Sequence, residues 1–158
     1  MLSDLLRLAL SIAVCQLAGF VGSIFTRTSV GTWYANLEKP SFTPPNWVFS
    51  PVWITLFVLM GIAAFLVWNK GLSDQRVKIA LSIFAVQLIL NVLWSVMFFG
   101  LRSPLAGLIE IAILWIAILL SIFYFLKVSN IAGILLMPYI LWVSFAAVLN
   151  FSIWRLNT

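Results

Sequence analysis

Residues 33–53 read WYANLEKPSFTPPNWVFSPVW, and this aromatic, proline-rich stretch lies between the first two of several long apolar segments. It holds three tryptophans, one tyrosine, two phenylalanines and four prolines. Proline stiffens the backbone and removes hydrogen-bond donors, and indole and phenol rings offer flat apolar faces with one polar group each. The stretch therefore predicts an ordered aromatic lid over something flat and apolar.

The composition on either side of this stretch is that of a membrane protein. Of 158 residues, 64% are hydrophobic and only 8% are charged, with a mean hydropathy of +1.16. A bilayer-spanning helix needs about 20 apolar residues, and the chain has five such segments, at 5–25, 47–68, 79–99, 105–126 and 131–154. They lack the alternation of barrel strands. We expect an all-α bundle of five transmembrane helices, forming one domain over residues 1–158 with loop 26–46 as a lid.

Charge and residue usage exclude several functions. The nine Lys and Arg residues are scattered singly, which argues against a nucleic-acid surface. They divide five against four between the two sides of the membrane, which is too even to orient the chain. The sequence has no histidine and a single cysteine, Cys15, so the usual zinc and haem ligand sets and serine–histidine catalysis are absent. We expect no metal site.

The first apolar segment carries small residues at helical spacing: Cys15, Gly19 and Ser23 share one face, with Ala18 and Gly22 beside it. Small residues four apart let helices approach closely in lipid. The pattern favours packing within the bundle or a dimer seam, and the wall of a pocket is the alternative.

The other four segments bring polar and aromatic side chains to one depth. At about 1.5 Å rise per residue, the set lies roughly 8–12 Å below the loop-bearing surface, and it comprises Trp53, Asn91, Trp94, Glu110 and Asn150. Trp142 falls near the midplane by the same reckoning. These positions predict a pocket between helices, capped by the loop, although core packing would also account for the three indoles.

Glu110 is the one carboxylate within a predicted span, and burying it unpaired is costly. Arg102 is a candidate partner across the short connection, and a structural pair and a functional carboxylate both remain open. Asn91 and Asn150 could simply hydrogen bond across helices. Pro138 predicts a kink in the last segment. The indoles at the ends of segments, Trp47, Trp68 and Trp154, are expected to be interfacial anchors.

Several ordered motifs give the chain a specific resemblance over residues 19–157. Beside the loop, they are MGIAAFLVW at 60–68, NVLWSVMFFGLRSP at 91–104 and PYILWVSFAAVLNFSIWRLN at 138–157. In these motifs the chain resembles the translocator protein family (TspO/MBR). The resemblance implies five transmembrane helices, a homodimer, and binding of porphyrins such as protoporphyrin IX or haem as ligands rather than as tightly held cofactors. It also implies binding of drug-like apolar molecules.

The resemblance also carries site residues onto this sequence. The matching pocket positions are Trp33, Tyr34, Trp53, Phe57, Asn91, Trp94, Trp142, Ala146 and Leu149. Depth and charge add Glu110, Arg102 and Asn150 as candidate polar support. The indoles of Trp53 and Trp142 match positions linked in bacterial relatives to light-dependent porphyrin breakdown. The sterol-recognition pattern fails because Phe151 stands where it needs a tyrosine. A bacterial cell membrane is therefore the expected location, rather than an animal mitochondrion.

Three functions remain open at this point. The chain could be a receptor or carrier for tetrapyrroles, a photochemical enzyme that oxidises bound porphyrin, or a structural membrane protein whose pocket is incidental. Stacking of a flat macrocycle on indoles favours binding. Only the resemblance supports catalysis, because the residues contain no conventional catalytic motif.

Overall fold

The computed structural model describes residues 3–158 and contains five helices long and apolar enough to cross a membrane. The first two residues of the predicted domain lie outside the described part. In chain order the elements are α1 (Asp4–Val30), η1 (Tyr34–Asn36), α2 (Asn46–Trp68), α3 (Gln75–Ser95), η2 (Val96–Gly100), α4 (Pro104–Val128), α5 (Asn130–Leu135) and α6 (Met137–Leu156). The prediction of a five-helix transmembrane bundle is confirmed, and the protein is a multi-pass integral membrane protein.

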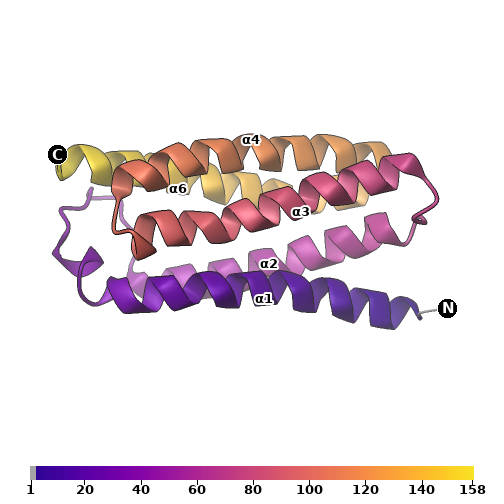
Figure 1. Cartoon of the computed structure of the whole chain (residues 1–158), viewed down its shortest axis with the longest axis horizontal. Helices are drawn as coiled ribbons and strands as arrows, with labels where there is room; N and C mark the ends of the chain where they lie inside the picture. The colour runs from indigo at the N-terminus through magenta and orange to yellow at the C-terminus, as the bar shows by residue number, and fades with distance from the viewer. Residues whose placement is uncertain (1–2) are drawn as a thin grey trace.

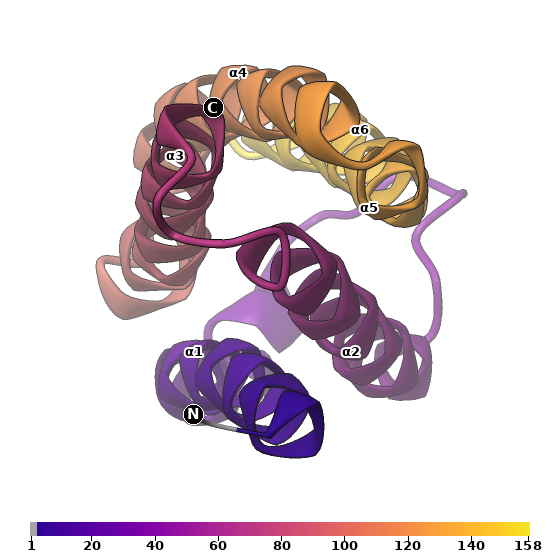
Figure 2. The same ribbon diagram turned by 90° about the vertical axis from the view of Figure 1, so that its right-hand side faces the viewer.

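The helices run along one axis, with the N-terminus at one end and the long loop and the C-terminus at the other (Figure 1). Seen end-on, α1 and α2 form one side, and α3, α4 and α5–α6 form an arc opposite (Figure 2). Contacts between neighbours close a ring in the order α1, α2, α5–α6, α4, α3 and back to α1. The third, fourth and fifth spans follow one another through short connections and pack antiparallel as neighbours (Figure 1).

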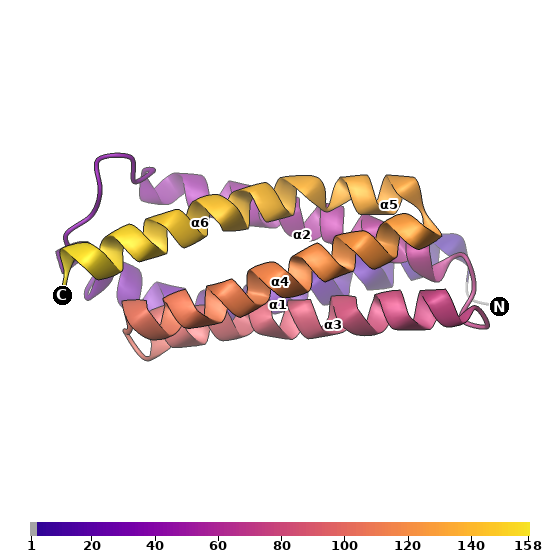
Figure 3. The same cartoon turned by 90° about the horizontal axis from the view of Figure 1, so that it is seen from above.

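The last span is broken at Leu136, two residues before Pro138 in the first turn of α6. Proline has no N–H and its ring clashes with the preceding turn, so it is best tolerated in the first turn of a helix. The predicted kink is thus a break between two helices. The short α5 packs on both α4 and α2, whereas α6 packs mainly on α4, and Figure 3 shows α6 diverging from α2 toward the loop end.

The first loop is shorter than predicted, because residues 26–30 continue α1 and the loop covers residues 31–45. The hydroxyl of Ser29 donates to the Phe99 carbonyl at 2.8 Å and fixes the last turn of α1 against η2. That carbonyl belongs to a π-helical turn, in which the Leu101 N–H donates to the Val96 carbonyl at 2.7 Å. The connection is therefore anchored to the bundle before it leaves the helix.

The loop itself is ordered by the helix ends beneath it. The backbone of Glu38 makes two hydrogen bonds with the Asn157 side chain, 3.0 and 2.9 Å long. Tyr34 is buried against Phe98 and Phe99, and the ammonium of Lys39 lies 4.7 Å from the centre of its ring. These contacts join the loop to η2 and to the C-terminal end of α6, and they fix it as a cap on this end of the bundle.

Candidate functional site

A cavity of about 630 Å³ lies between α1, α2, α3 and α6 under the first loop. Its position follows from the divergence of α6 from α2, which leaves a space that Gly31 and Tyr34 of the loop border. A cavity of this size is within the range of small-molecule sites, about 300–1,000 Å³. We refer to it as the interhelical cavity.

The α1 wall of the cavity is built from small and polar residues. Its lining residues are Gln16, Gly19, Phe20, Gly22, Ser23, Thr26, Arg27 and Val30. A β-carbon added at Gly19 would lie 2.6 Å from the Phe57 ring, so the missing side chain leaves room for that ring. The small-residue face was expected mainly to pack against another helix, and the structure shows that it also lines the cavity.

The opposite walls are aromatic. Trp53 stacks on Phe57 with ring centres 5.7 Å apart, and Trp94 stacks on Phe98 at 5.2 Å. Phe49 meets the face of Trp142 edge-on at 5.8 Å. Because each ring packs against a neighbouring ring, its motion is restricted, and these aromatic side chains line the cavity without filling it.

Polar groups fix the orientation of these rings. The Trp94 indole N–H donates to the Asn150 Oδ1 at 3.1 Å, and the Asn150 amide donates to the Pro104 carbonyl at 2.8 Å. Trp142 differs, since its indole N–H is buried and has no hydrogen-bond partner among residues 3–158. A buried donor without an acceptor costs free energy, and a ligand carrying an acceptor would remove that cost.

A hydrogen-bonded chain underlies the deep end of the cavity. The Asn91 amide donates to the Tyr139 hydroxyl at 2.8 Å, and that hydroxyl donates to the Gln87 Oε1 at 2.7 Å. The Gln87 amide lies 3.8 Å from the Met60 sulfur. Asn91 lines the cavity while Tyr139 and Gln87 are fully buried below it. Asn91 thus forms the hydrogen bond across helices that its sequence position allowed, and it also lines the cavity.

The structure brings eight of the nine predicted pocket residues to this one cavity: Tyr34, Trp53, Phe57, Asn91, Trp94, Trp142, Ala146 and Leu149. Tyr34 is the aromatic side chain that the loop contributes. Burial raises the pKa of the Tyr34 phenol above its usual 10.0, so the ring is neutral at physiological pH. That these residues bind a ligand stays a prediction.

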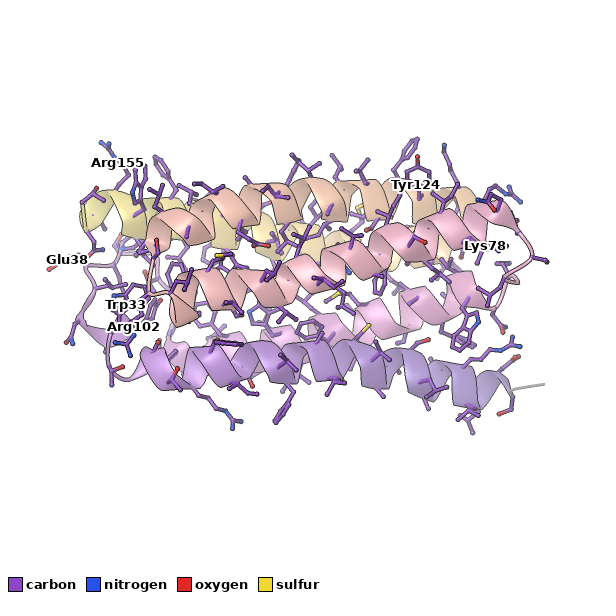
Figure 4. The ribbon with its side chains drawn as sticks, in the orientation of Figure 1. Trp33, Glu38, Lys78, Arg102, Tyr124 and Arg155 are labelled. Carbon is purple, nitrogen blue, oxygen red and sulfur yellow. The ribbon has the colours of Figure 1, made fainter. Side chains whose placement is uncertain are left out.

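The ninth residue, Trp33, lies in a separate pocket of about 350 Å³ at the loop end, which we name the outer pocket (Figure 4). Its lining residues are Trp33, Leu37, Arg102, Ser103, Pro104, Leu105, Trp154, Asn157 and Thr158. Trp33 does not line the interhelical cavity, and its ring packs edge to face with Phe98, which does line it, 5.5 Å between centres. It marks a second site rather than a wall of the first.

The fourth span does not contribute as expected, since no residue of α4 in the described chain lines the interhelical cavity. Glu110 is buried on the packed face of α4, and neither carboxylate oxygen has a hydrogen-bond partner among residues 3–158. Its predicted pairing with Arg102 is wrong. Arg102 is exposed ahead of the helix, with φ of +53°, whereas Glu110 lies well inside it.

Sequence reasoning missed the polar rim of the interhelical cavity. Arg27 lines it from the last turn of α1, and Asn46 and Ser50 line it from the first turns of α2. Arg27 is the one cation among the described lining residues, and that lining contains no carboxylate. The sequence did contain a sign of this rim. Arg27 follows Ser23 by four residues and therefore lies on the same face of the helix as the small residues.

Comparison with known proteins agrees with the family resemblance that the sequence motifs indicated. The model of the TspO/MBR family matches residues 11–155. The chain is 48% identical to the tryptophan-rich protein TspO of Chlorobaculum tepidum, over 98% of each chain. It is 50% identical to the protein of that name from Archaeoglobus fulgidus, over 98% of this chain and 99% of the relative. The human translocator protein is 38% identical, over 90% of this chain and 85% of its own.

Proposed function

The chain belongs to the TspO/MBR family, and from that premise we propose that it is a membrane receptor or carrier that binds porphyrins in the interhelical cavity. Protoporphyrin IX or haem would bind as a ligand, and drug-like apolar molecules would occupy the same space. The name of the human relative, translocator protein, fits movement of such a ligand.

The observation that carries this proposal is the set of indoles around one cavity. Trp53, Trp94 and Trp142 come from three different helices and all line it. A flat macrocycle buries both faces when it stacks between aromatic side chains, and each aromatic pair contributes about 0.5–1.5 kcal/mol beyond its buried area. If these indoles only packed the core, we would expect other side chains to fill the space between them.

The charge on the rim supports a ligand with carboxylates. Arg27 is the lining cation, and the N-terminus of α2, where the helix dipole is positive, lies at the same end of the cavity. The first turn of α2 lacks a side-chain cap on its backbone N–H groups. A porphyrin could thus bury its ring between the indoles while its propionates stay at the rim beside Arg27.

This proposal is tested by comparing protoporphyrin IX with its dimethyl ester, which keeps the ring and loses both charges. The dissociation constant of each is measured by porphyrin absorption in detergent, for the wild type and for Arg27→Gln. We expect the wild type to bind both, and the substitution to weaken only the diacid, by about tenfold for one lost charge-assisted hydrogen bond. Arg155→Gln, at the same end but outside the cavity, is the matched control.

Two outcomes would contradict the proposal at different levels. Absence of saturable binding of either porphyrin to the wild type would remove the function itself. Equal weakening of the diacid and the ester in Arg27→Gln would leave binding intact and show that the rim charge does not select the ligand. To separate a carrier from a receptor, porphyrin flux into proteoliposomes is compared with binding.

A second candidate function is light-driven oxidation of bound porphyrin by dioxygen. The observation that favours it is the pair Trp53 and Trp142, which both line the cavity, so each indole could exchange an electron with an excited ring between them. Illumination should bleach the bound porphyrin faster than the free porphyrin, and more slowly in the Trp53→Phe, Trp142→Phe double variant. Equal bleaching of bound and free porphyrin would exclude catalysis.

The predicted homodimer stays a proposal, and a sterol is a doubtful ligand because its recognition pattern is imperfect. Phe151 is exposed on the outer face of α6, where a sterol would lie in the bilayer. Without the hydroxyl of a tyrosine at this position, we expect weaker sterol binding than the complete pattern would give.

A further inference from the structure

The outer pocket is a second site whose chemistry differs from that of the interhelical cavity. It lies where the loop, the start of α4 and the end of α6 meet, at the end of the bundle that faces the membrane surface (Figures 1 and 4). Two of its side chains are indoles, Trp33 and Trp154, and one is a cation, Arg102. The described lining contains no aspartate or glutamate side chain.

Arg102 offers a free cation in this pocket. Its guanidinium forms no ion pair with any residue between 3 and 158, where the one salt bridge joins Arg76 to Asp74 at the opposite end of the bundle. Its backbone has φ of +53°, a left-handed conformation that is costly for a residue other than glycine. Because this backbone conformation is costly, we expect the Arg102 side chain to have a function beyond the geometry of the turn.

The walls of the pocket are fixed before any ligand binds. Trp33 is held by Phe98, and Asn157 is held by its hydrogen bonds to the Glu38 backbone and to the Ile153 carbonyl at 2.7 Å. Leu105, the second residue of α4, is half exposed on the apolar side of the pocket. The arrangement therefore has an apolar flank below and a cation above, as at a bilayer interface.

The charge around the pocket decides which anion fits. The cations Arg27, Lys39 and Arg155 lie at the same end of the bundle, and Glu38 is the carboxylate of the loop. Figure 4 shows Arg102 beside Trp33, whereas Arg155 projects away from the bundle and Glu38 lies at the outer edge of the loop. An ammonium headgroup would meet net repulsion here, while a phosphate diester with an uncharged headgroup would not.

From these observations we propose that the outer pocket binds the phosphate of an anionic phospholipid with an uncharged headgroup. The phosphate would accept hydrogen bonds from the Arg102 guanidinium, whose planar fork matches two phosphate oxygens. The glycerol and the start of one acyl chain would lie against Trp33, Leu105 and Trp154. The lipid would then join α4, α6 and the loop from outside the interhelical cavity.

The test is native mass spectrometry of the full chain released from nanodiscs that contain equal amounts of phosphatidylglycerol and phosphatidylcholine. We expect the wild type to retain phosphatidylglycerol preferentially, and Arg102→Gln to reduce the retained fraction about tenfold, toward that of phosphatidylcholine. Arg102→Lys should retain an intermediate fraction, because a lysine keeps the charge without the planar fork. Arg155→Gln, with the same loss of charge at the same end, should match the wild type.

Other outcomes would overturn the proposal. Equal retention of both lipids by the wild type, or equal losses in Arg102→Gln and Arg155→Gln, would show that the pocket does not select the phosphate. Displacement of the lipid by millimolar inorganic phosphate would show that the site takes the free anion. If Arg102→Gln fails to fold by circular dichroism, Leu105→Trp serves instead, since a larger ring fills the pocket without changing its charge and should also abolish the preference.

Discussion

The two ends of the bundle are built in opposite ways. Away from the loop, Val67, Val77, Phe125 and Ala132 are fully buried, and side chains from four helices fill the space between them. At the loop end, the rings of Trp53, Trp94 and Trp142 stand around a cavity of about 630 Å³. In lipid, helix association depends on close packing and interhelical hydrogen bonds. The packed end therefore stabilises the bundle, and this stability permits the hollow end.

The junction between the two ends explains how one chain holds both. The break before Pro138 lets α5 stay against α2 while α6 leans toward α4. The chain of hydrogen bonds through Asn91, Tyr139 and Gln87 lies at this depth and joins α3 to α6. A closed hydrogen-bond network in the dry interior resists rearrangement, so it can prevent the cavity from closing.

The largest expected effect comes from removing a ring at the packed end. Phe125→Ala should lower the free energy of unfolding by about 3–5 kcal/mol, because the surrounding helices cannot fill the space. Phe49→Ala is the matched variant at the hollow end, where the ring already borders a cavity and loses mainly its contact with Trp142, worth about 0.5–1.5 kcal/mol. Unfolding in mixed micelles measures both, and equal losses would remove the distinction between the two ends.

Two glycines sharpen the comparison, because a β-carbon at either would approach a neighbour to 2.6 Å. At Gly61 that neighbour is the Ile12 Cα, which is backbone, and Gly61→Ala should cost about 1–3 kcal/mol by forcing α1 from α2. At Gly19 it is the Phe57 ring, which can turn into the cavity. Gly19→Ala should thus cost less stability and weaken porphyrin binding instead. The reverse pattern would contradict this account.

The junction itself is tested by Tyr139→Phe. The substitution keeps the ring and leaves the Asn91 amide and the Gln87 Oε1 without their buried partner, at about 1–3 kcal/mol. It should also loosen the deep end of the cavity, so we expect weaker ligand binding with little change in the far-ultraviolet circular dichroism spectrum. An unchanged unfolding midpoint together with unchanged binding would show that the network does not hold the cavity open.

The smallest expected effect lies at the packed end, outside the membrane. Asp74 caps α3 and accepts hydrogen bonds from the Arg76 side chain and backbone, which lowers the pKa of its carboxyl below the usual 3.8. Its contribution is therefore complete above about pH 4 and is lost as the pH falls through the lowered value. Asp74→Asn should remove this acid sensitivity. A wild type and variant with identical stability from pH 5 to pH 2 would refute the assignment.

The number and place of the helices were predictable because each needs only a run of apolar residues. The common depth of Trp53, Asn91 and Trp94 followed from the helical rise alone. Which faces meet was harder to predict, because helices that are apolar all round give little sign of their inner face. Glu110 illustrates this difficulty, since its depth was predicted, but it faces the packed interior of α4 and not the cavity.

Local backbone departures account for the remaining differences. The π-helical turn at Val96–Gly100 buries both Phe98 and Phe99, which a regular helix would turn to different faces. Trp33 then packs against Phe98 and not over the interhelical cavity. The left-handed conformation of Arg102 places that residue outside the helix, away from Glu110. Arg102 is not a glycine, so its left-handed conformation had no sign in the sequence, and the one glycine of the π-helical turn, Gly100, stands only at its last position.

The most direct test of the central claim compares two pairs of indoles in porphyrin binding. Trp53→Phe with Trp142→Phe changes the cavity, whereas Trp68→Phe with Trp115→Phe changes two indoles that do not line it. The dissociation constant of protoporphyrin IX is measured by porphyrin absorption in both. We expect the first pair to raise it about fivefold or more, for roughly 1 kcal/mol of lost stacking, and the second to leave it unchanged. Equal dissociation constants in the two double variants would contradict the claim that the ligand binds at the hollow end.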